Sequence, residues 1–262
     1  MHRWLLNHVD TVMLMLLFVV AAVGFAFLVL TLMRRFAPSL DDREQNEVAV
    51  LSVEIVGAVY GIILGFVIVA LWEGFNAADD NVAREATAIS AIVRNADAFA
   101  PEARDRVKLA VGEYVHAVVD DEFEMLREGK NSPRAATAVD GIYAALQSYE
   151  PRTETQRAFY TGAVARLDDM LAARRTRLEQ SESSLPDALR VMMYSGFVII
   201  VTFMAAIGSA RRGVQTVMLL GVTAIIAFNL VLATTLDYPF SGDVSVSSEP
   251  FTTGVLAQFS VH

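Results

Sequence analysis

Four long runs of hydrophobic residues interrupt an otherwise polar chain. They cover residues 11–33, 48–72, 189–210 and 214–236. A helix rises 1.5 Å per residue, so about 20 residues cross the hydrocarbon core of a bilayer, and each run is longer than that. The first run is followed by arginines, whereas a signal peptide carries its positive charges before a shorter apolar segment. We therefore predict four membrane-spanning helices.

The segment between the second and third runs, residues 73–188, has a different pattern. Apolar residues recur there at intervals of three and four, which predicts amphipathic helices in water. The first, around residues 82–96, continues the second span directly. Proline and glycine separate three further helices, expected at residues 101–129, 133–149 and 153–182.

The expected helix over residues 153–182 has an apolar stripe that we predict to face the core of this domain. Its members are Phe159, Val164, Leu167, Leu171 and Leu178. The polar segment contains no strand-like alternation. The predicted fold class is an all-α integral membrane protein with four transmembrane helices and a helical soluble domain inserted between spans two and three. The predicted parts are a membrane hairpin at 1–72, the soluble domain at 73–188, a second hairpin at 189–236 and a loop-like or extended tail at 237–262.

Composition agrees with a chain that meets both lipid and water. Hydrophobic residues make up 54% and charged residues 19%, below the quarter usual in soluble domains. The net charge of −9 lies mostly in the middle segment and offers no basic stripe for a phosphate backbone, which argues against nucleic acid. The chain has no cysteine, which excludes thiolate nucleophiles and cysteine-ligated metals.

Arginines in the short loops indicate the orientation in the membrane. Basic residues in short loops favour the cytoplasmic side, and only Arg3 and Arg190 lie close to the membrane on the opposite side. The short-loop arginines are Arg34, Arg35, Arg43, Arg211 and Arg212. We therefore expect a multi-pass protein of the bacterial inner membrane, with cytoplasmic short loops and with the middle domain and both termini outside.

The second span carries the most informative motif. Gly57, Gly61 and Gly65 recur at every fourth residue, a spacing that lets two helix backbones approach closely in lipid. At 100° per residue, Glu54, Ile68 and Trp72 fall on the same stripe. Two interpretations stay open, packing within one four-helix bundle and packing between subunits or along a pore. Glu54 is likewise either a functional carboxylate within the membrane or a side chain that snorkels to its surface.

Other chemistry is weakly indicated. Glu113, His116 and Asp120 share one helical face and are weak candidates for a divalent cation. With no second cluster of ligands in the sequence, we interpret this face as a solvated acidic surface and predict no metal site. Metalloprotease, phosphate-loop and nucleophile-elbow motifs are missing from the sequence. We expect no enzymatic activity and no cofactor.

Two motifs resemble the bestrophin-like domain family of bacterial membrane proteins. The first is the sequence Tyr-Gly-Ile-Ile-Leu-Gly-Phe from Tyr60 to Phe66, which is followed by Trp72, Phe75 and Glu85. The second lies after the fourth span and includes Asp237, Pro239, Phe240 and the later Pro250-Phe251. The resemblance covers nearly the whole chain.

The resemblance implies a remote relation to bestrophins, which are homo-pentameric anion channels with a pore lined by the second span. It also implies that the helical domain lies in the cytoplasm, whereas the arginines of the short loops place it outside. We base the predicted orientation on the arginines. Bestrophin necks are rings of aliphatic and aromatic residues, whereas this span offers a glutamate and a glycine stripe.

The first functional hypothesis is a homo-oligomeric channel for inorganic ions, with span two along the axis. Rings of Glu54 and Glu73 would favour cations. The alternative is a membrane sensor or scaffold that presents its helical domain to a ligand or partner. A transporter or motor stator would need more ionisable groups within the membrane than one glutamate.

Overall fold

The computed structural model describes residues 2–36, 43–182, 185–207 and 212–259, with no strand among them. Its α-helices are α1 (His2–His8), α2 (Thr11–Phe36), α3 (Arg43–Ala96), α4 (Pro101–Ala117), α5 (Phe123–Arg127), α6 (Pro133–Gln147), α7 (Glu154–Gln180), α8 (Asp187–Ala206) and α9 (Arg212–Leu236). A π-helical turn (Val118–Glu122) joins α4 to α5, and two 3₁₀ turns (Glu249–Phe251 and Gly254–Phe259) lie in the tail.

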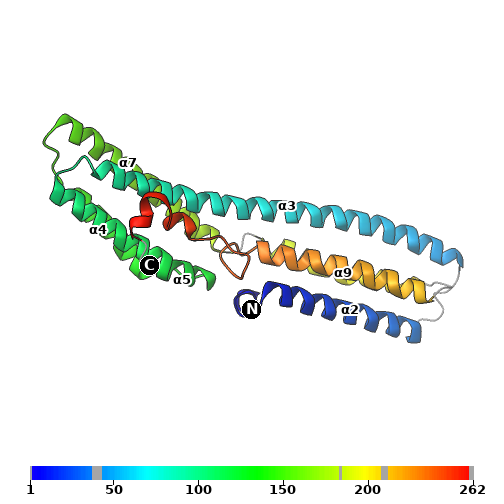
Figure 1. The fold of residues 1–262 in the computed structure, drawn as a ribbon. Helices are drawn as coiled ribbons and strands as arrows, with labels where there is room; N and C mark the ends of the chain where they lie inside the picture. Colours follow the sequence, from blue (N-terminus) through cyan, green and yellow to red (C-terminus); the bar gives the residue numbers. More distant parts are fainter. Residues whose placement is uncertain (1, 37–42, 183–184, 208–211, 260–262) are drawn as a thin grey trace. The chain divides into compact units, whose positions relative to one another are not determined.

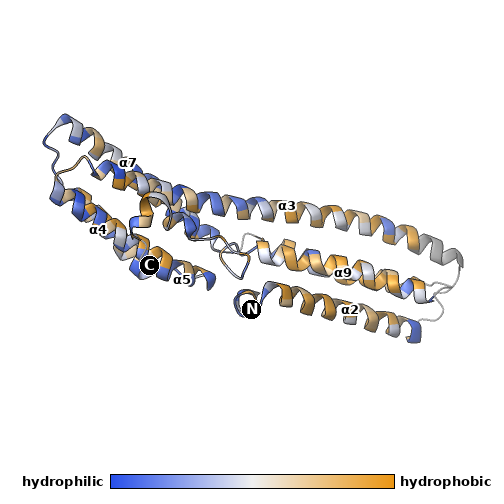
Figure 2. Ribbon diagram, in the orientation of Figure 1, coloured by the Kyte–Doolittle hydropathy of each residue, from blue (hydrophilic) through white to orange (hydrophobic). Residues whose placement is uncertain are grey.

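Helices α2, α3, α8 and α9 are long and apolar enough to cross a membrane, and Figure 2 shows that hydrophobic residues prevail along α2 and α9. The prediction of an all-α chain with four such helices is confirmed. The end of the predicted third span, 208–210, and Arg211 lie outside the described residues. Helix α3 does not end with the predicted second span at residue 72, since it runs for 54 residues without a break, as the continuation into residues 82–96 predicted.

Contacts divide the chain into two compact units (Figure 1). The first unit consists of residues 1–74 and 183–237, and the second of residues 75–182 and 238–262. Helix α3 contributes to both units. The tail belongs to the second unit, where Phe251 and Leu256 are fully buried.

In the first unit α3 packs on α8 through a close contact that requires a glycine. The hydroxyl of Tyr60 donates a hydrogen bond of 2.8 Å to the carbonyl oxygen of Met193. A Cβ placed on Gly196 would lie 2.4 Å from the Tyr60 ring, so only glycine lets the ring approach this backbone. The residues of α3 buried in this unit are Tyr60, Leu64, Val67 and Leu71.

Polar contacts hold each end of the membrane helices. Asp237, buried at the end of α9, accepts hydrogen bonds from the backbone of Leu185 at 2.8 Å and from Arg190 at 2.9 Å. Near the other end of α2, Arg34 donates to the Arg212 carbonyl and to two side chains of α9, Gln215 and Thr216.

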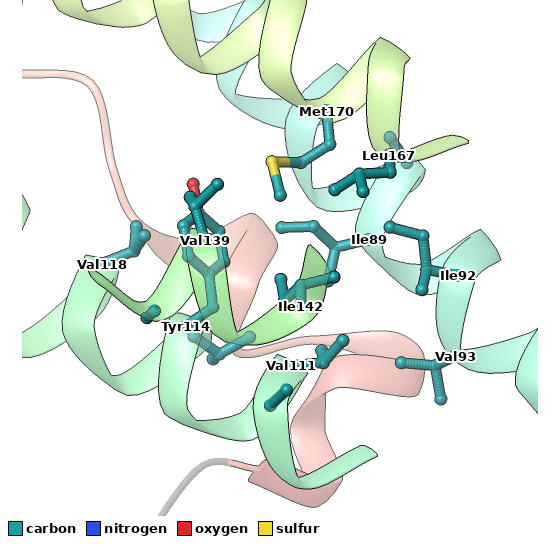
Figure 3. Close-up of a cluster of buried hydrophobic side chains, with 14 of the residues drawn as sticks. Ile89, Ile92, Val93, Val111, Tyr114, Val118, Val139, Ile142, Leu167 and Met170 are labelled. Carbon is teal, nitrogen blue, oxygen red and sulfur yellow. The ribbon is translucent and has the colours of Figure 1, made fainter. Parts of the chain in front are cut away.

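The second unit has a hydrophobic core built by α3, α4, α6, α7 and the tail (Figure 3). Helix α3 enters this core with a fully buried position every three or four residues. These positions are Ala78, Val82, Glu85, Ile89, Ile92 and Ala96. Five of them are apolar and one is a glutamate.

The inner stripe predicted for α7 is confirmed in part. Leu167 lies in the core, and Leu171 and Leu178 are partly buried and pack against it. Phe159 and Val164 are wrong, since they are 42% and 36% exposed. The side chains that α7 does bury are Ala163, Leu167, Met170, Ala173 and Arg177. The prediction relied on hydrophobicity, which selected the larger side chains of α7. The close packing of this helix instead favours small side chains, and a network of ion pairs buries Arg177.

The expected helix over residues 101–129 is present but contains the π-helical turn. Pro101 occupies its first turn, as expected for an N-terminal proline. Gly129 ends it with a positive φ of 73°, a conformation that glycine adopts readily. The acidic residues of this π-helical turn face opposite ways, because Asp120 is exposed to solvent and Glu122 is fully buried in the core.

Candidate functional site

Glu54 is the only charged side chain of α3 between Val50 and Trp72, and it is exposed. No hydrogen bond or ion pair joins it to any other residue that the structure describes. An ionised side chain facing lipid at mid-depth costs at least about 2.5 kcal/mol on insertion scales. The single chain therefore leaves this carboxylate without the environment it needs.

Contacts between neighbouring helices give the level of Glu54 along the apolar helices of the first unit. Tyr60 of α3 reaches Met193 of α8, and one turn further along α8 the ring of Phe197 lies 6.2 Å from that of Phe25 in α2. Glu54 precedes Tyr60 by about 9 Å along α3, so it lies roughly level with Phe25. Phe25 is about 21 Å from the start of α2 and 16 Å from its end, so Glu54 lies near the middle of the apolar length. This level favours a carboxylate within the membrane over one that snorkels to its surface.

The glycine stripe beside Glu54 has no packing partner within the described residues. A Cβ placed on Gly57, Gly61 or Gly65 would meet nothing within 4 Å among the described atoms. Among the described residues no neighbouring side chain fills the stripe, so it is an open face of α3 that is exposed at Gly61 and Gly65 and partly buried at Gly57. Packing between subunits or along a pore stays a prediction.

The helical period divides the membrane part of α3 into three faces. At 100° per residue, the glycine stripe lies about a quarter turn from the buried positions Tyr60 and Leu64. Bulky apolar side chains cover the remaining side, with Ile55 65% and Phe66 72% exposed. The further stripe residue Ile68 is partly buried, Trp72 is 53% exposed and the neighbouring Glu73 is exposed. Glu54 and the glycines thus form a small-residue face with one carboxylate.

A second set of charged residues lies in the core of the second unit. Arg177 is fully buried and binds both carboxylate oxygens of Glu85, from Nε at 2.7 Å and from Nη2 at 3.0 Å. Its Nη2 also donates to the buried Glu122 at 3.2 Å, and Arg174 donates to Glu122 at 2.7 Å. Two guanidinium groups thus balance two carboxylates, so the network carries no net charge.

Tyr114 completes this network by donating a hydrogen bond of 2.5 Å to Glu85. Burial, and then the charge of Glu85, raise the pKa of Tyr114 well above its usual value, so the hydroxyl keeps its proton. Burial lowers the pKa of Arg177, but the Glu85 carboxylate outweighs this effect and the net shift is upward. Arg177 therefore stays charged.

Two aromatic rings cover the Arg177 guanidinium. Its central carbon lies 5.4 Å from the ring centre of Phe123 and 6.0 Å from that of Phe251. Nη1 is buried without a hydrogen-bond acceptor in the described part of the chain. A cation close to aromatic ring faces is attracted by their quadrupoles, which compensates for part of the missing hydrogen bond. The network joins α3, α4, the π-helical turn, α7 and the tail.

Comparison with known proteins was made on the whole chain. A family model described as the Bestrophin-like domain matches residues 20–251, which include both the open face of α3 and the buried network. The chain belongs to the bestrophin-like domain family. At the level of the family, this points to a channel-like membrane protein. No curated protein and no solved structure matches the chain.

The residues that carried the resemblance to the bestrophin-like family have different structural roles. Tyr60 and Asp237 hold the membrane helices together, and Glu85 anchors the buried network. Phe66 is exposed on the bulky face of α3, and Phe75 packs against the core of the second unit. Pro239 and Phe240, which follow α9, are buried.

The structure of this bestrophin-like chain also brings together residues that sequence analysis missed. Glu122 and Arg177 were not selected, because a charged residue in a polar segment is ordinarily solvated. A signal was nevertheless present for Arg177, which continues the spacing of three and four residues set by Ala163, Leu167 and Met170. Glu122 had no such signal, because the π-helical turn changes the helical period at that position.

The weak metal candidates do not form a cluster. His116 Nδ1 lies 3.8 Å from Asp120, and Glu113 is exposed. Among the described residues, no group of three or more His, Asp or Glu side chains could hold a metal ion. The three residues provide one solvent-exposed pair and a separate carboxylate.

Proposed function

We propose that this chain forms a homo-oligomeric membrane pore for inorganic ions, in which α3 borders the axis. The observation that carries the proposal is the Glu54 carboxylate, exposed inside the membrane span and unpaired among the described residues. A water-filled passage, or a neighbouring copy of the chain, would give this carboxylate the polar environment that lipid denies it. Membership of the bestrophin-like family supports the same conclusion.

The open glycine stripe supports association through α3. Small residues allow close approach of helices in lipid, where packing replaces the hydrophobic effect as the driving force. Gly57, Gly61 and Gly65 leave this surface unfilled in one chain. A neighbouring copy packed here would bring several Glu54 side chains around one axis.

The charge of the passage would favour cations. Glu54 and the exposed Glu73 lie about 28 Å apart along α3, so a symmetric assembly would carry two acidic rings. Rings of carboxylates select cations in other channels. The family relationship alone would have suggested anions.

Ion flux in liposomes tests this proposal. We expect the purified protein to conduct, with cations more permeant than anions. Glu54→Gln should lower the cation-to-anion permeability ratio, measured from reversal potentials in a salt gradient. Glu113→Gln, an exposed change on α4, is the matched control and should leave the ratio unaltered. Oligomeric protein that never conducts, or a Glu54→Gln channel with an unchanged ratio, would contradict the proposal.

A sensor or scaffold role is the second candidate, and a groove in the second unit favours it. The groove lies between α3 and α7 and has a volume of about 1030 Å³. Ala83, Ala91 and Ala172 line it, with Arg84 and Asp169 among its charged residues. Affinity capture tests this role. Recovery of a distinct protein that Ala172→Trp no longer binds supports it, and recovery of only further copies of this chain argues against it.

A further inference from the structure

We propose that α1 lies in the headgroup layer of the bilayer, with Trp4 as its anchor. The binding partner of this surface is the lipid interface itself. This inference concerns residues 2–10, which take no part in the open face of α3 or in the buried network. It therefore stands whether or not the chain conducts ions.

The geometry of α1 directs a tryptophan away from the protein. Trp4 is 61% exposed, whereas Leu6 is 2% exposed and holds α1 against the first unit. The Trp4 ring stacks on His8 at 4.8 Å between ring centres. The Nδ1 atom of His8 lies 2.9 Å from the Trp4 carbonyl oxygen. The exposed ring is thus held in place by its own helix.

Helix α1 ends where the first membrane span begins. Asp10 accepts hydrogen bonds from the backbone of Val12 at 2.9 Å and Met13 at 3.2 Å, which fixes the start of α2 at Thr11. From Thr11 to Arg34 the helix rises about 35 Å, compared with a hydrocarbon core of about 30 Å. Thr11 is therefore at the edge of the hydrocarbon, and α1 precedes it by only two residues.

The second tryptophan of the chain marks the same level. Trp72 follows Glu54 by about 27 Å along α3, and Thr11 precedes Phe25 by about 21 Å along α2. Because Glu54 and Phe25 are roughly level, Trp72 and Thr11 lie within about one helical turn of each other in depth. Trp72 is 53% exposed. The only two tryptophans of the chain therefore lie near one membrane surface.

The chemistry of α1 suits a headgroup layer better than water or hydrocarbon. Tryptophan is enriched at membrane interfaces, where its ring meets the apolar boundary and its N–H meets polar groups. A helix of seven residues is too short to span the membrane, so this position lets the Trp4 ring leave water.

Tryptophan fluorescence in vesicles tests this inference. The Trp72→Phe variant retains Trp4 as its only tryptophan and would be reconstituted into phosphatidylcholine vesicles, with or without phosphatidylglycerol. We expect the emission of Trp4 to be blue-shifted relative to water. Spin labels on the lipid headgroup should quench it more strongly than labels deep in the acyl chains. Trp4→Phe, with Trp72 alone, is the matched control and gives the depth of the second anchor.

Strong quenching of Trp4 by aqueous iodide, without quenching by any lipid label, would overturn the inference. Stronger quenching by deep labels than by headgroup labels would also overturn it. A second measurement keeps both tryptophans and the His8 ring, since a spin label on Val9→Cys is unique in a chain that has no cysteine. Its accessibility should be intermediate between that of a label in water and that of a label at Phe25→Cys.

Discussion

Two glutamates of α3 have opposite surroundings. Glu54 is exposed in the membrane span and unpaired within the described residues, whereas Glu85 is fully buried and accepts hydrogen bonds from Arg177 and Tyr114. Removing a charge from water is costly unless it is paired and hydrogen-bonded. Residues of the same chain supply the ion pair and the hydrogen bonds for Glu85. For Glu54, water or another copy of the chain must supply the polar contacts.

The buried network predicts that Glu85→Gln strongly destabilises the second unit. The substitution would leave the Arg177 charge inside the core with weaker acceptors, and breaking a buried pair typically costs about 3–5 kcal/mol. Thermal unfolding of the purified protein measures this loss. Glu113→Gln, on the exposed side of α4, is the control and should leave the unfolding temperature almost unchanged. Equal unfolding temperatures for the two variants would contradict the importance of the network.

Only part of this residue-level pattern could be read from the sequence. Glu85 follows the same spacing as its buried neighbours Val82 and Ile89, so its inward position could be predicted from the sequence. Its partner Arg177 lies 92 residues away. Pairings over such distances depend on tertiary packing, for which a single sequence carries no direct signal.

At the scale of elements, periodicity predicted α3 better than α7. The apolar spacing of α3 continues in phase through residue 72 into the soluble segment, so one long helix was expected and is present. In α7 the buried positions are two alanines, the predicted Leu167, a methionine and an arginine, while Phe159 and Val164 are exposed. Side-chain size misled the prediction because a tightly packed helix face favours small residues.

The contact between α3 and α8 predicts that Gly196→Ala destabilises the first unit. The new Cβ would lie 2.4 Å from the Tyr60 ring, so the ring or the α8 backbone must shift, and overpacking of this kind typically costs about 1–3 kcal/mol. The free energy of unfolding in mixed micelles measures the effect. Gly24→Ala is the matched control, because a Cβ there meets nothing within 4 Å. An equal loss for both variants would show that this contact is not tight.

At the scale of the whole molecule, assembly through α3 should be separable from folding. Gly61→Leu fills a surface that is open in the single chain, so we expect native helix content with a lower assembled mass, measured by light scattering in detergent. Gly24→Leu is the matched control. Gly24 is also an exposed glycine in a span, and a Cβ there also meets nothing within 4 Å, but it lies on α2.

If neither variant changes the mass, the glycine stripe is not the interface. If both lower it equally, any bulky change in a span disrupts assembly and the assignment to α3 fails. Loss of mass in Gly61→Leu alone would assign the assembly to the glycine face of α3, the face that also carries Glu54.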